Sequence, residues 1–175
     1  MTTITNPFKR YYGNKQKKKY DSRSPTLLND YITLITGMFE EKCVNIEIEE
    51  SMKPKFAKHR RAIYSLLSGL EDLRKTMIRA QQIHSSQINK LQKENYKIRS
   101  TMKADVVETP ENNNRRIILD RNMRAIAFAK RSSREITRTI AIKNIDPMKE
   151  KLQAALEKFV LFSATLVEEE HVFEV

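Results

Sequence analysis

Apolar residues recur every seven positions between residues 53 and 103. The first row is Ile63, Leu70, Met77, His84, Leu91 and Ile98, and a companion row of Leu66, Leu73 and Ala80 is interrupted at Gln87 and Glu94. A seven-residue repeat keeps one stripe of a helix turned towards a neighbouring helix. We therefore predict a long helix over 54–103 with a coiled-coil-like stripe. On that stripe, His84 is expected to be a partly buried polar residue that tunes the register.

Helix start signals mark two shorter apolar patterns. Ser24 is a candidate N-cap and Pro25 suits the first helical position, which predicts a helix over 25–42. Asp146 and Pro147 repeat this pair and predict a helix over 147–168. The intervening segment VNIEIEE at 44–50 alternates apolar and polar residues, which is typical of a strand. Because no partner strand is evident, this segment could instead continue the preceding helix.

A basic run, RNMRAIAFAKRSSREITR, occupies 121–138 and follows a segment, 105–114, that we expect to be a loop. With about 100° per residue, a helix over 114–144 would carry the arginines of this run on one side. These arginines are Arg121, Arg124, Arg131, Arg134 and Arg138. Nearly opposite lie Ile118, Leu119, Ala125, Ile126, Ala129, Ile136 and Ile140. The pattern predicts an amphipathic helix with a buried apolar face and an available arginine face.

Residues that make tight turns are scarce in this chain. It has 3 glycines and 5 prolines in 175 residues, whereas a β-rich fold needs a turn roughly every 8 to 12 positions. We expect an all-α fold, an elongated helical bundle or hairpin. A single helical domain over 24–175 would follow a flexible basic arm over 1–23.

The formal net charge is +11, and the sequence pI is about 9.8. Positive charge of this size favours partners such as nucleic acid, an anionic membrane or an acidic protein. The charge is unevenly spread, since 53–103 carries a net +10 and 114–145 a net +7, while 24–52 carries a net −5. The counter-charge for the arginine face could therefore come from this chain's own acidic blocks, from a neighbouring subunit or from an external polyanion.

Two further basic segments are candidate contacts for nucleic acid. In the N-terminal arm, aromatic residues alternate with cations, an arrangement that suits base stacking combined with phosphate contact. The candidate residues of the arm are Lys9, Arg10, Lys15, Lys17, Lys18 and Lys19. At the start of the long helix they are Lys58, Arg60 and Arg61.

Motifs for catalysis or metal binding are missing from the sequence. Phosphate loops and nucleophile elbows need glycines at fixed positions, and Gly69 more readily serves close helix packing. Cys43 is the sole cysteine, and the three histidines share no ligand spacing. We expect no enzyme activity, no cofactor and no metal. With neither a signal peptide nor a membrane-spanning run, we expect an intracellular protein, cytoplasmic or nuclear.

The function that these features favour is non-specific binding of RNA or DNA by a self-associating helical protein, in a packaging or assembly role. One alternative is a membrane-surface or membrane-remodelling scaffold that meets anionic lipid through the same cations. That alternative needs exposed bulky apolar residues, and the apolar faces are expected to be used in packing. A third hypothesis is a structural subunit that pairs with acidic protein surfaces.

Overall fold

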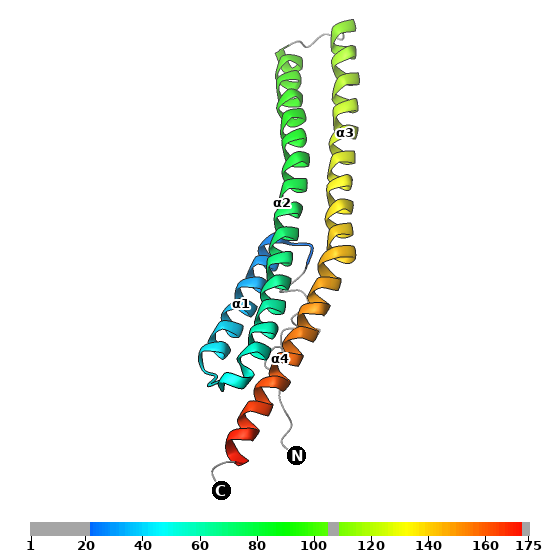
Figure 1. Ribbon diagram of the computed structural model, residues 1–175. Coiled ribbons are helices and arrows are strands. Elements are labelled where there is room, and N and C mark those ends of the chain that lie inside the picture. The colour runs from blue at the N-terminus through cyan, green and yellow to red at the C-terminus, as the bar shows by residue number, and fades with distance from the viewer. Residues whose placement is uncertain (1–21, 105–108, 173–175) are drawn as a thin grey trace. The chain divides into compact units, whose positions relative to one another are not determined.

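The computed structural model describes residues 22–104 and 109–172, with the backbone alone for 103–104 and 167–172. Its elements are α1 (Pro25–Val44), a 3-10 turn η2 (Glu50–Met52), α2 (Lys53–Ala104), α3 (Pro110–Ile140), a π-helical segment η3 (Ala141–Ile145) and α4 (Asp146–Val172) (Figure 1). The described ranges contain no strand. The prediction of an all-α fold is confirmed.

The chain divides into two compact units. Unit 1 takes residues 1–75 and 140–175, and unit 2 takes residues 76–139. Unit 1 therefore combines α1 with the first part of α2 and with α4, whereas unit 2 is the hairpin formed by the rest of α2 and most of α3. Residues 1–21, almost all of the predicted arm, lie outside the described ranges.

The start of α1 is the one predicted. Ser24 has an extended backbone and its side chain accepts a hydrogen bond of 3.3 Å from the backbone N–H of Leu27, with Pro25 in the first turn. At its other end the helix stops at Asn45, whose N–H still reaches the carbonyl of Glu41 at 3.3 Å. Residues 45–49 are neither strand nor helix. The strand interpretation of 44–50 was wrong, because the described chain contains no partner strand. The helix interpretation was also wrong, because α1 ends at Val44.

Aromatic rings form the centre of unit 1. Phe39 of α1 is fully buried and meets Phe159 of α4 edge-on at 4.9 Å between ring centres, and Tyr64 of α2 at 5.5 Å. Aliphatic residues from the same three helices surround them, namely Leu28, Ile35, Ile63, Leu70, Leu152 and Leu156. A Cβ at Gly69 would lie 2.7 Å from the sulfur of Met148. The expected role of Gly69 in close helix packing is confirmed.

The expected loop at 105–114 was too long, since α3 begins at Pro110. Thr109 caps the helix, because its Oγ1 accepts from the N–H of Asn112 at 3.2 Å and its carbonyl from the N–H of Asn113 at 3.1 Å. A capping threonine followed by proline is the same start signal as Ser24 with Pro25. The three asparagines favoured a loop but lie in the first turns of the helix.

The predicted break at Asp146 was also wrong. Asp146 has helical backbone angles, φ −60° and ψ −44°, and α3, η3 and α4 follow one another without a non-helical residue. Its carboxylate accepts a 2.6 Å hydrogen bond from Ser22 Oγ instead of capping a helix. A proline inside a regular α-helix clashes with the carbonyl four residues earlier, and a π-helical turn widens the backbone there. Pro147 is therefore accommodated directly after η3.

Unit 2 pairs α2 and α3 in antiparallel directions (Figure 1). On α2 the residues of the stripe from Met77 to Ile98 are buried or half-buried, but the companion row is displaced by one residue. Ile88 is half-buried and Asn95 is buried, whereas Gln87 and Glu94 are exposed. Spacings of four and three alternate along the contact, so the second row follows the first by four residues instead of the three that we assumed.

Most of the fully buried side chains described in unit 2 are polar. Asn122 Nδ2 donates a 2.9 Å hydrogen bond to Asn95 Oδ1, and Gln81 Nε2 donates one of 3.4 Å to Thr137 Oγ1. Among the described residues of this unit, the fully shielded apolar side chains are Met77 and Ala129. Other apolar residues of the unit, among them Ile88, Leu91 and Ile118, are half-buried.

Candidate nucleic-acid interface

The predicted arginines of α3 are all exposed. Arg121, Arg124, Arg131, Arg134 and Arg138 lie on the side of α3 away from its buried positions. On the buried side lie Asn122, Ala129 and Thr137, whose spacing of seven and eight residues marks the contact with α2. Guanidinium groups on such a solvent face are free to make paired hydrogen bonds with phosphate oxygens.

Counter-charge on this face is scarce. Arg124 Nη2 forms an exposed ion pair of 2.9 Å with the carboxylate of Asp120. In the part of the chain that the structure describes, the other four arginines of the face make no ion pair or hydrogen bond. Exposed pairs such as Asp120 with Arg124 contribute little stability. Most of the positive charge on α3 is therefore available to a partner.

The net charge is concentrated in unit 2. Over 76–139 the sequence has fourteen Lys and Arg against six Asp and Glu, a net +8, and the rest of the chain has nineteen against sixteen, a net +3. The smaller unit therefore carries most of the chain's excess charge.

Bulky apolar residues stand among the arginines of α3. Phe128 is 67% exposed and Ile117 is 62% exposed. Neither residue belongs to the apolar face predicted for this helix. That prediction was wrong at Ile136, which is 39% exposed while its neighbour Thr137 is buried. The helical spacing predicted that Ile136 faces inward, but the buried residue at this point of the helix is Thr137.

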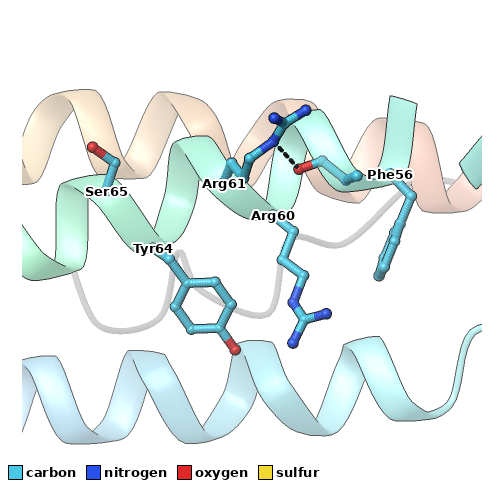
Figure 2. Close-up of a pocket in the computed structure, with 6 residues that line it drawn as sticks. Phe56, Arg60, Arg61, Tyr64 and Ser65 are labelled. Atoms are coloured by element: carbon cyan, nitrogen blue, oxygen red, sulfur yellow. Dashed lines mark hydrogen bonds between the residues drawn. The ribbon is translucent and has the colours of Figure 1, made fainter. Parts of the chain in front are cut away.

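The basic patch at the start of α2 is split between two sides of the helix. Figure 2 shows Arg60 and Tyr64 projecting towards α1, whereas Arg61 projects from the other side. The guanidinium of Arg60 lies 5.5 Å from the centre of the Tyr64 ring, and Tyr64 donates a 3.3 Å hydrogen bond to Glu40. Arg61 Nε donates to the carbonyl of Ala57 at 3.4 Å. The two arginines and Tyr64 line a shallow pocket of unit 1 together with Phe56. Because of their contacts with Tyr64 and Ala57, Arg60 and Arg61 are partly engaged within the chain. The third candidate of the patch, Lys58, is exposed.

His59 lies beside this patch and packs on aromatic rings of α4. Its ring centre is 5.0 Å from that of Phe162 and 6.5 Å from that of Phe159. Burial lowers the pKa of His59 below its ordinary value, and the nearby charges of Lys58 and Lys158 lower it further. The neutral imidazole is thus the form that this packing favours.

Sequence reasoning missed a cluster on the second half of α2. Lys93, Lys97 and Arg99 are exposed around Tyr96, which is itself 74% exposed. The stretch KLQKENYKIR at 90–99 carries the signal, because cations there flank an aromatic residue as in the N-terminal arm. The seven-residue repeat accounts for Leu91 and Ile98 of this stretch, whereas Tyr96 and its neighbouring cations lie outside the repeat.

The other candidate residues from the sequence are Cys43, His84 and the cations of the arm. Cys43 is half-buried, and burial raises the pKa of its thiol. His84 is half-buried on the stripe, and its shielded Nδ1 has no hydrogen-bond partner among the described residues. Within those same residues, no three His, Cys, Asp or Glu side chains gather as a metal site would require. The arm residues Lys9, Arg10, Lys15, Lys17, Lys18 and Lys19 lie outside the described ranges.

No described helix is both long enough and apolar enough to cross a bilayer. Comparison of the chain with protein families, with curated proteins and with solved structures found no match.

Proposed function

We propose that this protein binds the phosphate backbone of RNA or DNA non-specifically, through the arginine face of α3. The observation that carries the proposal is the row of exposed arginines on which, within the described residues, Asp120 is the only paired acid. Arginines that recur at three, four and seven residues along a helix repel one another. A polyanion relieves that repulsion and releases its own counterions, which is the main source of non-specific affinity.

Self-association is part of the same proposal. Most of the fully buried side chains among the described residues of unit 2 are polar, and tertiary packing supplies most of the stability of helices in water. Unit 2 also exposes bulky apolar residues, among them Ile83, Met123 and Phe128. A second copy of the chain would cover part of this surface and bring two arginine faces into one assembly.

A salt series tests the nucleic-acid proposal. Fluorescence anisotropy with a labelled oligonucleotide should give an affinity that falls steeply between about 50 and 200 mM salt, since each phosphate contact adds about 0.9 to the slope of log K against log salt. Several oligonucleotide sequences of equal length should give similar affinities. An affinity that does not change with salt would overturn the proposal.

A membrane surface is the second candidate, and the exposure of Phe128 and Ile117 favours it. A basic helix with exposed bulky apolar residues can lie in the headgroup region of an anionic bilayer. Co-sedimentation with phosphatidylserine vesicles and with neutral phosphatidylcholine vesicles tests this function at the salt used for the oligonucleotides. Binding to the anionic vesicles that is tighter than binding to oligonucleotides would favour the membrane over nucleic acid.

A further inference from the structure

Tyr96 stands on the outer side of the unit 2 hairpin, between two shallow grooves. One groove runs over α2 beside Asn89 and Lys93. The other lies between α2 and α3, where Met123 and Lys130 form its far wall. The ring of Tyr96 borders both grooves and is 74% exposed.

Cations from both helices line the two grooves beside this ring. Lys93 and Arg99 lie three residues before and after Tyr96, so they occupy neighbouring turns of the same helix face. Arg99 Nη2 reaches across to the sulfur of Met123 at 3.9 Å, which places its guanidinium over the groove between the helices. From α3, the exposed Lys130 adds a further cation.

On α2, acidic residues do not oppose these cations, and Asp120 of α3, three residues before Met123, is paired with Arg124. Glu94 is the sole Asp or Glu of the sequence between Thr76 and Ala104. It precedes Tyr96 by two positions, about 200° around the helix, and so projects from the opposite side. The groove is therefore a positive channel with one large planar ring at its edge.

We propose that this groove binds single-stranded nucleic acid, with one base stacked on Tyr96 and the neighbouring phosphates held by Lys93, Arg99 and Lys130. The inference rests on the proposed function and deepens it, because it names the class of strand that is preferred. Every base has a face that can stack, so the contact needs no particular sequence. In a duplex the base faces are already stacked on one another, and Tyr96 has no ring to meet.

The test uses the full chain and two probes of equal length, a single-stranded oligonucleotide of about 12 nucleotides and its duplex. Tyr96→Leu keeps an apolar side chain of similar bulk but removes the ring. We expect it to weaken single-strand binding about tenfold, the scale of one stacking contact, and to leave duplex binding within about twofold. Tyr96→Phe keeps the ring and should bind as the native chain does.

Gln87→Ala is the matched control, because Gln87 is also exposed on α2 in unit 2 but does not line either groove. It should change neither affinity. Far-ultraviolet circular dichroism checks that every variant stays helical. Equal binding of the Tyr96→Leu and native chains to the single strand would overturn the inference while leaving the proposed function in place. Failure of the native chain to bind either probe at low salt would overturn both.

Discussion

Asn122 Nδ2 donates a 2.9 Å hydrogen bond to Asn95 Oδ1 between α2 and α3, and both residues are buried. In a seam with few shielded apolar residues, this bond gives each amide a partner and defines one alignment of the two helices. A buried asparagine can fix register in this way at a cost in stability, since other alignments leave its amide unpaired. The hydrogen bond of this pair is shorter than the one between Gln81 and Thr137, which is 3.4 Å.

Removing one member of the pair should destabilise the hairpin. Asn95→Ala leaves the Asn122 amide buried without its partner, which costs about 1–3 kcal/mol. The double variant Asn95→Leu/Asn122→Leu should regain most of that loss, because it removes both polar groups together. Hydrogen–deuterium exchange of α3 amides measures the change in unit 2, and equal exchange in the native and Asn95→Ala chains would contradict the prediction.

Unit 1 should lose stability as the pH falls. The pKa of His59 is lowered in the folded chain, mainly by burial and then by Lys58 and Lys158. Its neutral form is thus favoured in the folded state, so this contribution is present above the unfolded pKa of about 6.5 and is lost as pH falls through the folded pKa. The melting midpoint of the native chain should therefore drop more between pH 7.5 and pH 5.5 than that of His59→Gln. His84 and His171 are present in both proteins and cancel in the comparison, and identical pH profiles would refute the role of His59.

The fold class and the helices themselves could be predicted because their signals are local. The capping pair of Ser24 and Pro25 and the scarcity of glycine act through the backbone alone. The wrong predictions concern positions whose structure depends on contacts with other parts of the chain. Asp146 with Pro147 carries a strong start signal, but the chain stays helical there because a π-helical turn accommodates the proline and Ser22 engages the carboxylate.

The exposure of the candidate arginines could also be anticipated, since helical periodicity alone places them on one side. What the sequence could not supply was the line of contact with α2, because a shift of one residue rotates a helix by about 100°. That shift explains the burial of Thr137 beside the exposed Ile136. The cluster around Tyr96 was missed for a related reason, since its groove takes residues from two helices.

Neutralising part of the arginine face should reduce the salt dependence of nucleic-acid binding. If each of Arg131, Arg134 and Arg138 contacts one phosphate of a duplex, replacing all three by glutamine lowers the slope of log K against log salt by about 2.7. Affinity at low salt should fall with it. Anisotropy titrations at four salt concentrations measure the slope.

The matched control for that variant removes the same charge from unit 1. Lys75, Lys143 and Lys151 are exposed and lie outside the arginine face. Their replacement by glutamine should change the slope by less than about one contact's worth, roughly 0.9. Equal losses in the two triple variants would mean that net charge, and not the face of α3, sets the affinity.

The contact line of α3 is tested by a polar substitution on each side of it. Ile136→Gln replaces an exposed side chain, and it should change stability by no more than about 0.5 kcal/mol because surface substitutions seldom cost more. Ala129→Gln places a larger polar side chain at a position that is 2% exposed against α2, where overpacking costs about 1–3 kcal/mol. Because alanine is the best helix former, helix propensity adds up to about 0.7 kcal/mol to the cost of Ala129→Gln. Faster hydrogen exchange along α3 is expected for Ala129→Gln alone. Faster exchange for Ile136→Gln as well would contradict the exposed position of Ile136.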